Sequence, residues 1–432
     1  MRDLIVRFTS LLFAFVTLSA SCVGDDDDVI SGPDPVPTVS RTVLVYMVAD
    51  NTLGTQWGCD DEDIREMLDG VKNGALNGGR LLVYHNRPKT DSGNPPQMLE
   101  ITPQGLKVLK TYPDDPSVYS VDPERISLVM DDMKSLAPAN DYGLVLWSHA
   151  NGWLGGTSEN DDRYRAFGDD RGYHITVQTL ARTLADERFA FIYFDCCLMG
   201  NVETIYELRD VTPWIVASPT ELSIDGMPYD RNVPVMFDPE LTDEDAVVSM
   251  AENTYKYYED NENGYDDGCQ IAVYNTACLE GLASVTRDIY ETVTVIDPWV
   301  SWIQRYNKPY DEGYVYDMDN LMEYFTTTTH RKDPDDPDNP DNEANKEYAA
   351  SLALLEAWRA QWRKVVVYGA ATRNGIGNLY IERYCGLGSF AIDQPSDITW
   401  RGYNTLQWWT DVVSAAPAYT CSSSKGYEVM RL

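Results

Sequence analysis

The chain has 432 residues and carries 69 acidic against 34 basic side chains, which gives a formal charge of −35. With 43% hydrophobic and 11% aromatic residues it can bury a large core, so a wholly disordered chain is excluded. The negative charge would be repelled by nucleic acids and by anionic membrane surfaces. A cationic substrate is the partner that this charge would attract.

The first 21 residues have the order of a secretory signal: basic, then apolar, then small residues. Residues 18–22 resemble a bacterial lipobox, with Leu18 one position earlier than usual, which makes Cys22 the expected lipidation site. The acidic residues 25–28 resemble the surface-export tag of Bacteroidetes lipoproteins. We therefore expect an exported outer-membrane lipoprotein at the cell surface, bound to the membrane only through its lipid. A periplasmic or a plainly secreted protein is the alternative.

The rest of the chain divides by composition. Residues 22–40 are acidic and Pro-rich, which is typical of a tether. Residues 41–415 alternate between strand and helix patterns, with a core at about 41–230 and a C-terminal part at about 231–415. Residues 416–432 are expected to be a tail.

Apolar runs predict a series of strands in chain order. These are 42–48, 80–86, 98–101, 106–112, 142–148, 189–195, 214–218, 270–274, 377–381 and 388–392. Helical periodicity predicts helices at 62–76, 123–136, 243–258, 279–295 and 348–365. Near-continuous apolar strands separated by helices are typical of a mostly parallel sheet covered on both faces, so we expect an α/β fold. Functional residues of such sheets gather at the carboxyl ends of the strands.

Two strand ends carry side chains suited to covalent catalysis. His149 follows the strand at 142–148, and two adjacent thiols, those of Cys196 and Cys197, follow the strand at 189–195, just before a helix expected near Asn201. A thiol needs a base to take its proton and a positive environment to hold its charge, which the histidine and the backbone N–H groups of residues 200–203 can supply. From spacing alone, a structural histidine and a buried apolar cysteine are alternatives.

Longer segments around these residues resemble a known family. They are residues 44–53 (LVYMVADNTL), 147–149 (WSH), and 194–200 (FDCCLMG) with Glu203 downstream, joined late in the chain by 317–325 and 388–395. They resemble the clostripain family of cysteine peptidases, which are relatives of caspases, legumains and gingipains. The resemblance runs from about residue 41 to residue 413. It implies a caspase-like α/β/α sandwich with a C-terminal extension and the activity of a cysteine endopeptidase.

The resemblance also implies roles for single residues. Cys197 precedes Leu-Met and matches the nucleophile, and His149 matches the general base. The amides of Ala150 and Cys197 would form the oxyanion hole, although the family commonly has Gly at position 150, and a turn that needs a positive φ would suit Ala poorly. Cys196 takes the place of the usual Ala and would point away from Cys197. A disulfide between these two cysteines would inactivate the enzyme. Asn51 or Asp50 is the candidate for a supporting role beside the dyad.

Specificity for Arg or Lys before the cleaved bond follows from the same resemblance. Asp195 matches a family position that lines the pocket for a basic side chain, and Asp225 is a second candidate, with a plain turn residue as its alternative. The loop 155–173 contains Arg163 and Arg165, which are candidates for self-cleavage.

No cofactor is expected to be required. The spacing of Cys and His does not match a zinc site. The acidic segments 258–267 and 333–341 are candidates for binding Ca²⁺, with plain solvated charge as the alternative, since neither has the EF-hand pattern. The expected partner is a peptide or protein with a basic residue before the cleaved bond, and the chain is expected to be a monomer. A catalytically silent lipoprotein that keeps the peptidase fold and binds peptides or a partner is the competing hypothesis.

Overall fold

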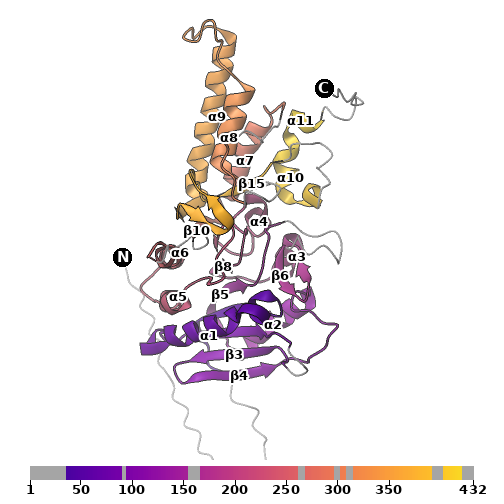
Figure 1. The fold of residues 1–432 in the computed structure, drawn as a ribbon, viewed down its shortest axis with the longest axis vertical. Coiled ribbons are helices and arrows are strands. Elements are labelled where there is room, and N and C mark those ends of the chain that lie inside the picture. The colour runs from indigo at the N-terminus through magenta and orange to yellow at the C-terminus, as the bar shows by residue number, and fades with distance from the viewer. Residues whose placement is uncertain are drawn as a thin grey trace, which may run out of the picture. The chain divides into compact units, whose positions relative to one another are not determined.

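A sheet of nine strands is the centre of the computed structural model, with the order β12-β10-β9-β8-β5-β1-β2-β3-β4 (Figure 1). The structure describes residues 36–89, 94–153, 166–260, 268–295, 302–307, 315–391 and 402–420. The strands of the sheet are β1 (Val39–Val48), β2 (Arg80–Asn86), β3 (Gln97–Thr102), β4 (Gly105–Thr111), β5 (Ala139–Trp147), β8 (Phe191–Asp195), β9 (Trp214–Ala217), β10 (Gln270–Asn275) and β12 (Val366–Ala371).

The middle of this sheet is parallel. Strands β9, β8, β5, β1 and β2 pair in parallel, whereas β3 and β4 at one edge and β10 and β12 at the other pair antiparallel. The parallel strands are the near-continuous apolar runs of the sequence, because both of their faces are covered. The predicted α/β fold with a mostly parallel sheet is thus confirmed.

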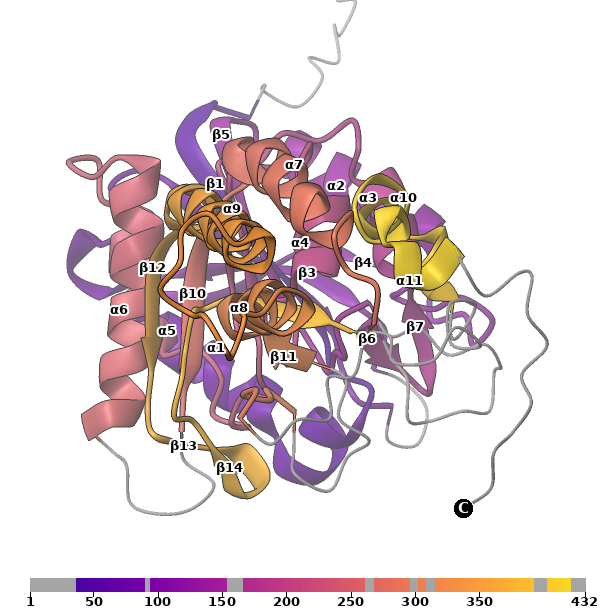
Figure 2. The same ribbon diagram turned by 90° about the horizontal axis from the view of Figure 1, so that it is seen from above.

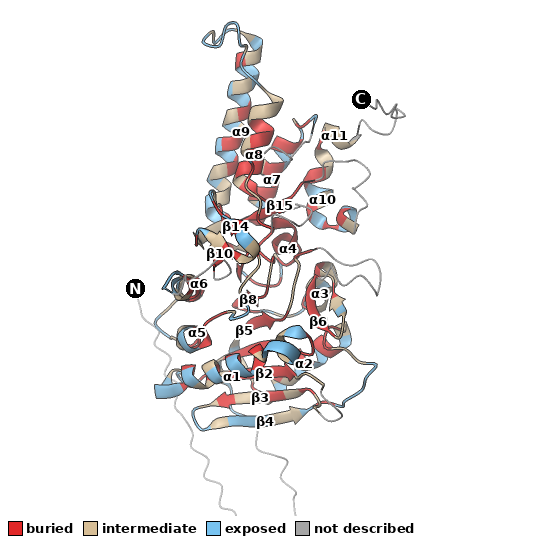
Figure 3. Cartoon of the chain, in the orientation of Figure 1, coloured by how far each residue is buried: buried red, intermediate tan, exposed pale blue. Residues whose placement is uncertain are grey.

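Helices cover the two faces of the sheet, and alternate residues of each strand point to them (Figure 2). One face carries α1 (Cys59–Gly70), α5 (Tyr229–Met236) and α6 (Asp243–Asp260), and receives Val43, Val45 and Met47 of β1. The other carries α2 (Pro123–Leu136), α3 (Val177–Thr183), α4 (Val202–Glu207) and α7 (Leu279–Tyr290), and receives Leu44, Tyr46 and Val48. Figure 3 shows the central strands buried and the edge strand β4 largely exposed.

The C-terminal part adds helices and two small strand pairs, and a third small pair lies nearer the N-terminus. The helices are α8 (Met318–Thr329), α9 (Glu343–Val365), α10 (Gln407–Asp411) and α11 (Pro417–Thr420). The strand pairs are β11 (Val315–Asp317) with β15 (Gly388–Phe390), β13 (Asn374–Gly375) with β14 (Leu379–Tyr380), and, nearer the N-terminus, β6 (Phe167–Asp170) with β7 (Tyr173–Ile175).

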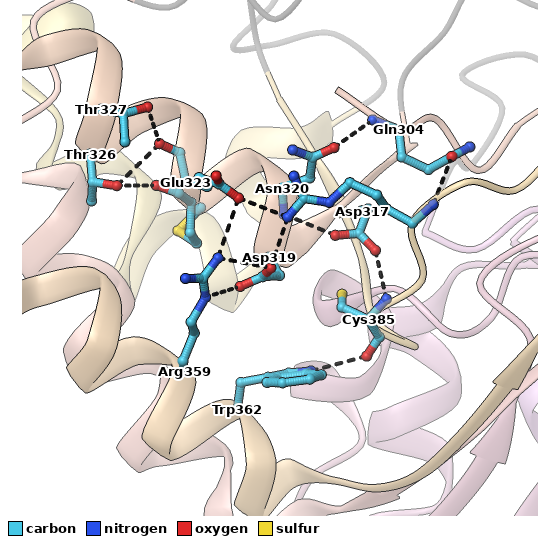
Figure 4. Close-up of polar contacts among 12 residues, drawn as sticks. Gln304, Asp317, Asp319, Asn320, Glu323, Thr326, Thr327, Arg359, Trp362 and Cys385 are labelled. Carbon is cyan, nitrogen blue, oxygen red and sulfur yellow. Dashed lines mark hydrogen bonds and ion pairs between the residues drawn. The ribbon is translucent and has the colours of Figure 1, made fainter. Parts of the chain in front are cut away.

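Ion pairs join α8 and α9 to the segment before β15 (Figure 4). Arg359 of α9 lies 2.6 Å from Asp319 and 3.3 Å from Glu323 of α8. Arg383 lies 2.7 Å from Glu323 and 3.3 Å from Asp319. Two cations and two carboxylates therefore form one network that fixes this segment beside the helices.

Several predicted helix ends were wrong. The helix expected at 62–76 ends at Gly70, because an Asn-Gly turn follows in which Asn73 has a φ of +60°. The helix expected at 279–295 ends at Tyr290. Helix α9 begins at Glu343, five residues before its predicted start, since Asn342 caps it through the amide of Ala344. Helix α5 and strand β12 were not predicted.

Among the residues that the structure describes, no helix is both long and apolar enough to cross a membrane.

Candidate active site

The register between β5 and β8 sets the geometry of the site. These strands are direct neighbours in the sheet and run parallel, and Trp147 at the end of one pairs with Asp195 at the end of the other. His149 lies two residues beyond Trp147, and Cys197 lies two residues beyond Asp195. Because neighbouring strands are about 4.8 Å apart, the two residues leave the sheet side by side.

The segment that carries His149 is held to the end of β1. The hydroxyl of Ser148 donates to the carbonyl of Val48 (2.9 Å) and accepts the amide of Asp169 (3.0 Å). The Nε2 atom of His149 lies 2.7 Å from the hydroxyl of Thr52, which follows β1. This contact fixes one side of the imidazole ring. Thr52 was not among the predicted site residues, since a lone threonine after a strand carries no recognisable signal.

Asn51 and Asp50 shape the loop that holds Thr52. Asn51 donates its side-chain amide to the carbonyl of Asp169 (2.8 Å), and its buried side chain ties the end of β1 to the β6 strand. Asp50 accepts the amide of Lys89 (3.0 Å). Both residues therefore support the loop, and Thr52 makes the contact with the histidine.

An amide from a neighbouring loop reaches the thiol of Cys197. The amide of Leu222 lies 3.4 Å from its sulfur, which is the type of donor that stabilises a thiolate. The sequence predicted this role for the amides of residues 200–203. That prediction is corrected at Gly200, whose amide donates to the carbonyl of Ser218 (2.7 Å).

The turn after the thiol is strained and tightly fitted. Leu198 has a φ of +60°, a conformation that costs a residue with a Cβ about 1–2 kcal/mol. Its amide donates to the carbonyl of Thr220 (2.8 Å), and its carbonyl accepts the side chain of Asn201 (2.6 Å). Asn201 also caps α4 by accepting the amide of Thr204. These bonds hold the turn in its unfavourable conformation.

The histidine loop packs directly on this turn at Gly152. A Cβ at Gly152 would lie 2.4 Å from the side-chain nitrogen of Asn201 and 2.9 Å from the carbonyl oxygen of Leu198, and its φ is +62°. Only glycine fits such an approach. Gly152 therefore lets the loops that carry His149 and Cys197 touch.

Ala150 has an ordinary backbone conformation. It has no positive φ, since the turn places that requirement on Gly152. Ala150 forms an antiparallel bridge with Phe167. The two hydrogen bonds of this bridge, 3.0 and 3.1 Å long, are made by the residues that flank Ala150 and Phe167 in the chain. The N–H of Ala150 therefore points away from Phe167, as in a non-hydrogen-bonded pair.

Cys196 is separated from the site. It is 3% exposed and belongs to the core on the α4 face of the sheet, and burial raises the pKa of its thiol well above its ordinary value. Cys197 is half-buried at the loop of Leu222. The two cysteines are not joined to each other by a disulfide in the structure. Cys196 is thus a poor nucleophile, in accord with the expectation that it points away.

Asp195 supports the loop that carries Asp225. Its two carboxyl oxygens accept the amide of Met227 and the hydroxyl of Tyr229, each at 3.0 Å, and a Cβ at Gly226 would lie 2.9 Å from one of them. Asp195 is buried, whereas Asp225 is exposed. One candidate carboxyl thus lies at the base of the loop and the other on its surface.

Further carboxyl groups surround Asp195. Asp63 accepts the indole N–H of Trp147 (2.6 Å), and Glu66 accepts the amide of Tyr229 (2.9 Å). Burial raises the pKa values of Asp195 and Glu66 to about 7, and it raises the pKa of Asp63, with the charge of Asp195 adding to the effect. Neutral forms therefore persist here at pH values where ordinary carboxyls are ionised.

The remaining expectations meet the structure as follows. Cys22, Arg163 and Arg165 lie outside the described residues. A further histidine outside the candidate site, His85 at the end of β2, is buried and bonded to Asp60 (2.7 Å). Within the described ranges, no group of three or more His, Cys, Asp or Glu side chains could hold a metal ion. Binding of Ca²⁺ by the acidic segments stays a prediction.

The raised pKa values predict how stability changes with pH. A carboxyl whose pKa is higher in the folded than in the unfolded state stabilises the fold below its unfolded pKa of about 4, and this stabilisation is lost as pH rises through about 7. We expect Tm to fall from pH 5 to pH 8, by about 2–4 °C for each kcal/mol lost. Scanning calorimetry checks this. The Asp195→Asn variant should show a shallower fall, and an equal slope in both proteins would contradict the assignment.

Gly152 offers a test of the contact between the two loops. Gly152→Ala should lower the rate of Cys197 alkylation by iodoacetamide about tenfold or more, because the added Cβ must push the turn of Asn201 away. Gly172→Ala is the matched control, since Gly172 also has a positive φ but a Cβ added there would meet nothing within 4 Å. Equal rates in the two variants would show that the loop contact does not affect the thiol.

Comparisons with known proteins identify the family and the fold of the chain. The model of the clostripain family, Peptidase C11, matches residues 45–371. An inactive zymogen C11 protease from Parabacteroides distasonis is 26% identical, with a TM-score of 0.69 over 87% of this chain and 99% of that one. A secreted C11 cysteine protease from Bacteroides thetaiotaomicron, solved with an irreversible peptide inhibitor, is 24% identical, with a TM-score of 0.66 over 86% and 99%.

A further secreted C11 cysteine protease from Bacteroides thetaiotaomicron shares the fold at 19% identity and a TM-score of 0.69, covering 87% of this chain and 99% of that one. No curated protein sequence is significantly similar to the chain. The family match covers well over half of the residues and includes both strand ends that carry the candidate dyad. The chain therefore belongs to the clostripain family and is a cysteine peptidase.

Proposed function

We propose that this chain is an exported endopeptidase that cleaves after Arg or Lys, with Cys197 as nucleophile and His149 as general base. The observation that carries the proposal is the placement of these residues two positions beyond the paired ends of β5 and β8. A thiol and an imidazole that follow the carboxyl ends of two neighbouring parallel strands lie at the same edge of the sheet, where a substrate can reach both.

The reaction takes two steps. Cys197 attacks the scissile carbonyl while His149 receives the thiol proton and passes it to the leaving amine. Water then attacks the thioester, with the same imidazole taking its proton and returning it to the thiol. The hydroxyl of Thr52 at Nε2 restricts the ring to one orientation through both steps.

Backbone amides stabilise the oxyanion. The ordinary φ of Ala150 and the direction of its N–H support a role in the hole beside the amide of Cys197. The departure from the common Gly at position 150 is therefore compatible with activity, because the turn takes its positive φ at Gly152.

Two carboxyls select a basic side chain. Asp225, on the exposed surface of its loop, pairs with the guanidinium or ammonium group of the substrate, which charge-assisted hydrogen bonds favour. Asp195 lies beneath that loop and holds it through Met227 and Tyr229. It also adds negative potential to the pocket when it is ionised.

Export and self-cleavage complete the proposal. The signal pattern of residues 1–21 and the secreted relatives from Bacteroides thetaiotaomicron support export, with Cys22 as the lipid anchor at the outer membrane. An enzyme that prefers Arg would also recognise Arg163 and Arg165 in its own loop, and the inactive zymogen from Parabacteroides distasonis supports activation by processing.

One set of purified proteins tests these points. Under reducing conditions we expect hydrolysis of fluorogenic peptides ending in Arg or Lys, and not of those ending in Asp or Leu. Cys197→Ala should abolish it, whereas Cys196→Ala should retain it. Mass spectrometry should find cleavage after residue 163 or 165 in the wild type but not in Cys197→Ala. Equal cleavage in both proteins would refute self-processing.

The pocket needs a separate comparison. Asp225→Asn should lower kcat/KM for Arg substrates about 10- to 100-fold, the value of a charged hydrogen bond of about 1.5–3 kcal/mol. Asp230→Asn, which removes another exposed charge five residues away, is the control. A similar loss in both variants would indicate general attraction of cations and not a defined pocket.

A further inference from the structure

A buried glutamate ties the helix behind the nucleophile to the C-terminal part of the chain. Glu203 lies in the first turn of α4, six residues after Cys197, and its side chain is fully buried. One oxygen, Oε1, accepts the amide of Phe390 (2.8 Å), the hydroxyl of Ser389 (3.2 Å) and the hydroxyl of Tyr403 (3.3 Å). Three donors from residues 389–403 thus converge on a single carboxyl oxygen.

The same C-terminal residues also contact the histidine loop. Trp153, four residues after His149, packs its ring against Phe390, with centroids 5.1 Å apart, and against Tyr403, at 4.8 Å. The rings of Phe390 and Tyr403 are 4.8 Å from each other. These two residues therefore touch the histidine loop with their rings and the nucleophile helix through their bonds to Glu203.

Backbone contacts continue the connection. The amide of Gly388 donates to the carbonyl of Gly200 (2.9 Å), and Gly388 bridges Asn201, the cap of α4. A Cβ at Gly388 would lie 2.7 Å from the side chain of Val315. Strand β15 is thus seated between the nucleophile turn and β11 without space for a larger residue.

The segment before β15 is anchored to the helices of the C-terminal part (Figure 4). The carboxyl of Asp317 accepts the amide of Cys385 (2.6 Å), and the indole of Trp362 donates to the carbonyl of Cys385 (3.0 Å). The amide of Met318 donates to the carbonyl of Leu387 (3.0 Å). These contacts join the ion-pair network of α8 and α9 and give the segment a rigid support.

We propose that residues 383–390 together with Tyr403, here called the strap, hold the histidine loop and the nucleophile turn in register, with Glu203 and Tyr403 as positioning residues. The proposal rests on the Cys197–His149 dyad proposed above. Residues 383–390 and Tyr403 lie beyond residues 45–371, the range of the family match, whereas Glu203 lies inside it.

The energetic reason is the cost of misalignment. The turn at Leu198 is held in an unfavourable conformation by its neighbours, and the strap bonds the residues that follow it. Loss of these bonds lets the thiol and the imidazole move apart, and a displacement of about 1 Å in such a pair costs about 100-fold in rate. The pocket loop at 222–229 is held from the other face by Asp195, so KM should change little.

Three substitutions separate positioning from mere stability. Glu203→Leu keeps the volume but accepts no hydrogen bond, and it should lower both kcat and the rate of Cys197 alkylation about tenfold or more, with KM within about twofold. Glu203→Gln still accepts through its amide oxygen and should restore most of the rate. Tyr403→Phe keeps the ring but removes one donor, and should lower kcat about threefold.

Tyr46→Phe is the matched control, because Tyr46 is equally buried and donates one hydrogen bond, to the carbonyl of Ser120 (2.6 Å), within the core. Activities are compared well below the Tm of each protein, with the pH profile of alkylation as the second readout. The strap hypothesis is overturned if Glu203→Leu keeps the wild-type kcat and profile, or if Tyr46→Phe loses as much kcat as Tyr403→Phe. If Glu203→Leu does not fold, the comparison of kcat between Tyr403→Phe and Tyr46→Phe tests the strap hypothesis. A wild type whose Cys197 does not react instead refutes the dyad, and the strap with it.

Discussion

The parallel pairing of β5 with β8 is the constraint on which the candidate site depends. It places the ends of the two strands at one level, so that a histidine and a cysteine far apart in sequence emerge beside each other. Contacts of the two loops keep the histidine and the cysteine in these positions. Ser148 fixes one loop to β1, the bonds of Asn201 fix the other, and the two meet at Gly152.

The buried carboxyl groups around Asp195 are a second constraint on the site. The chain carries a large negative charge, yet some of its carboxyls lie buried beneath the pocket loop with raised pKa values. Their hydrogen bonds to Tyr229, Met227 and Trp147 show what they do for the fold, which is to hold the loop and the adjacent helices. In the proposed function, the ionised forms of these carboxyls would also attract a basic substrate side chain, so one arrangement would serve both stability and the proposed specificity.

The sequence allowed the sheet and the two strand ends to be predicted because they depend on local patterns. Continuous apolar runs mark parallel strands, and His149 and Cys197 directly follow such runs. Thr52, Leu222 and Tyr403 could not be found in this way, because they come from loops or from distant segments and are brought to the site only by tertiary packing. Helix α5 was missed because it is only eight residues long and contains Pro234.

The reactivity of the thiol tests the central claim most directly. The rate of Cys197 alkylation should be measured against pH in the wild type and in His149→Ala. If the imidazole accepts the thiol proton, the wild type should react well below the ordinary thiol pKa of about 8.5, and the variant should lose this acidic reactivity and react only as a free thiol does. Identical profiles in the two proteins would contradict the pairing of Cys197 with His149.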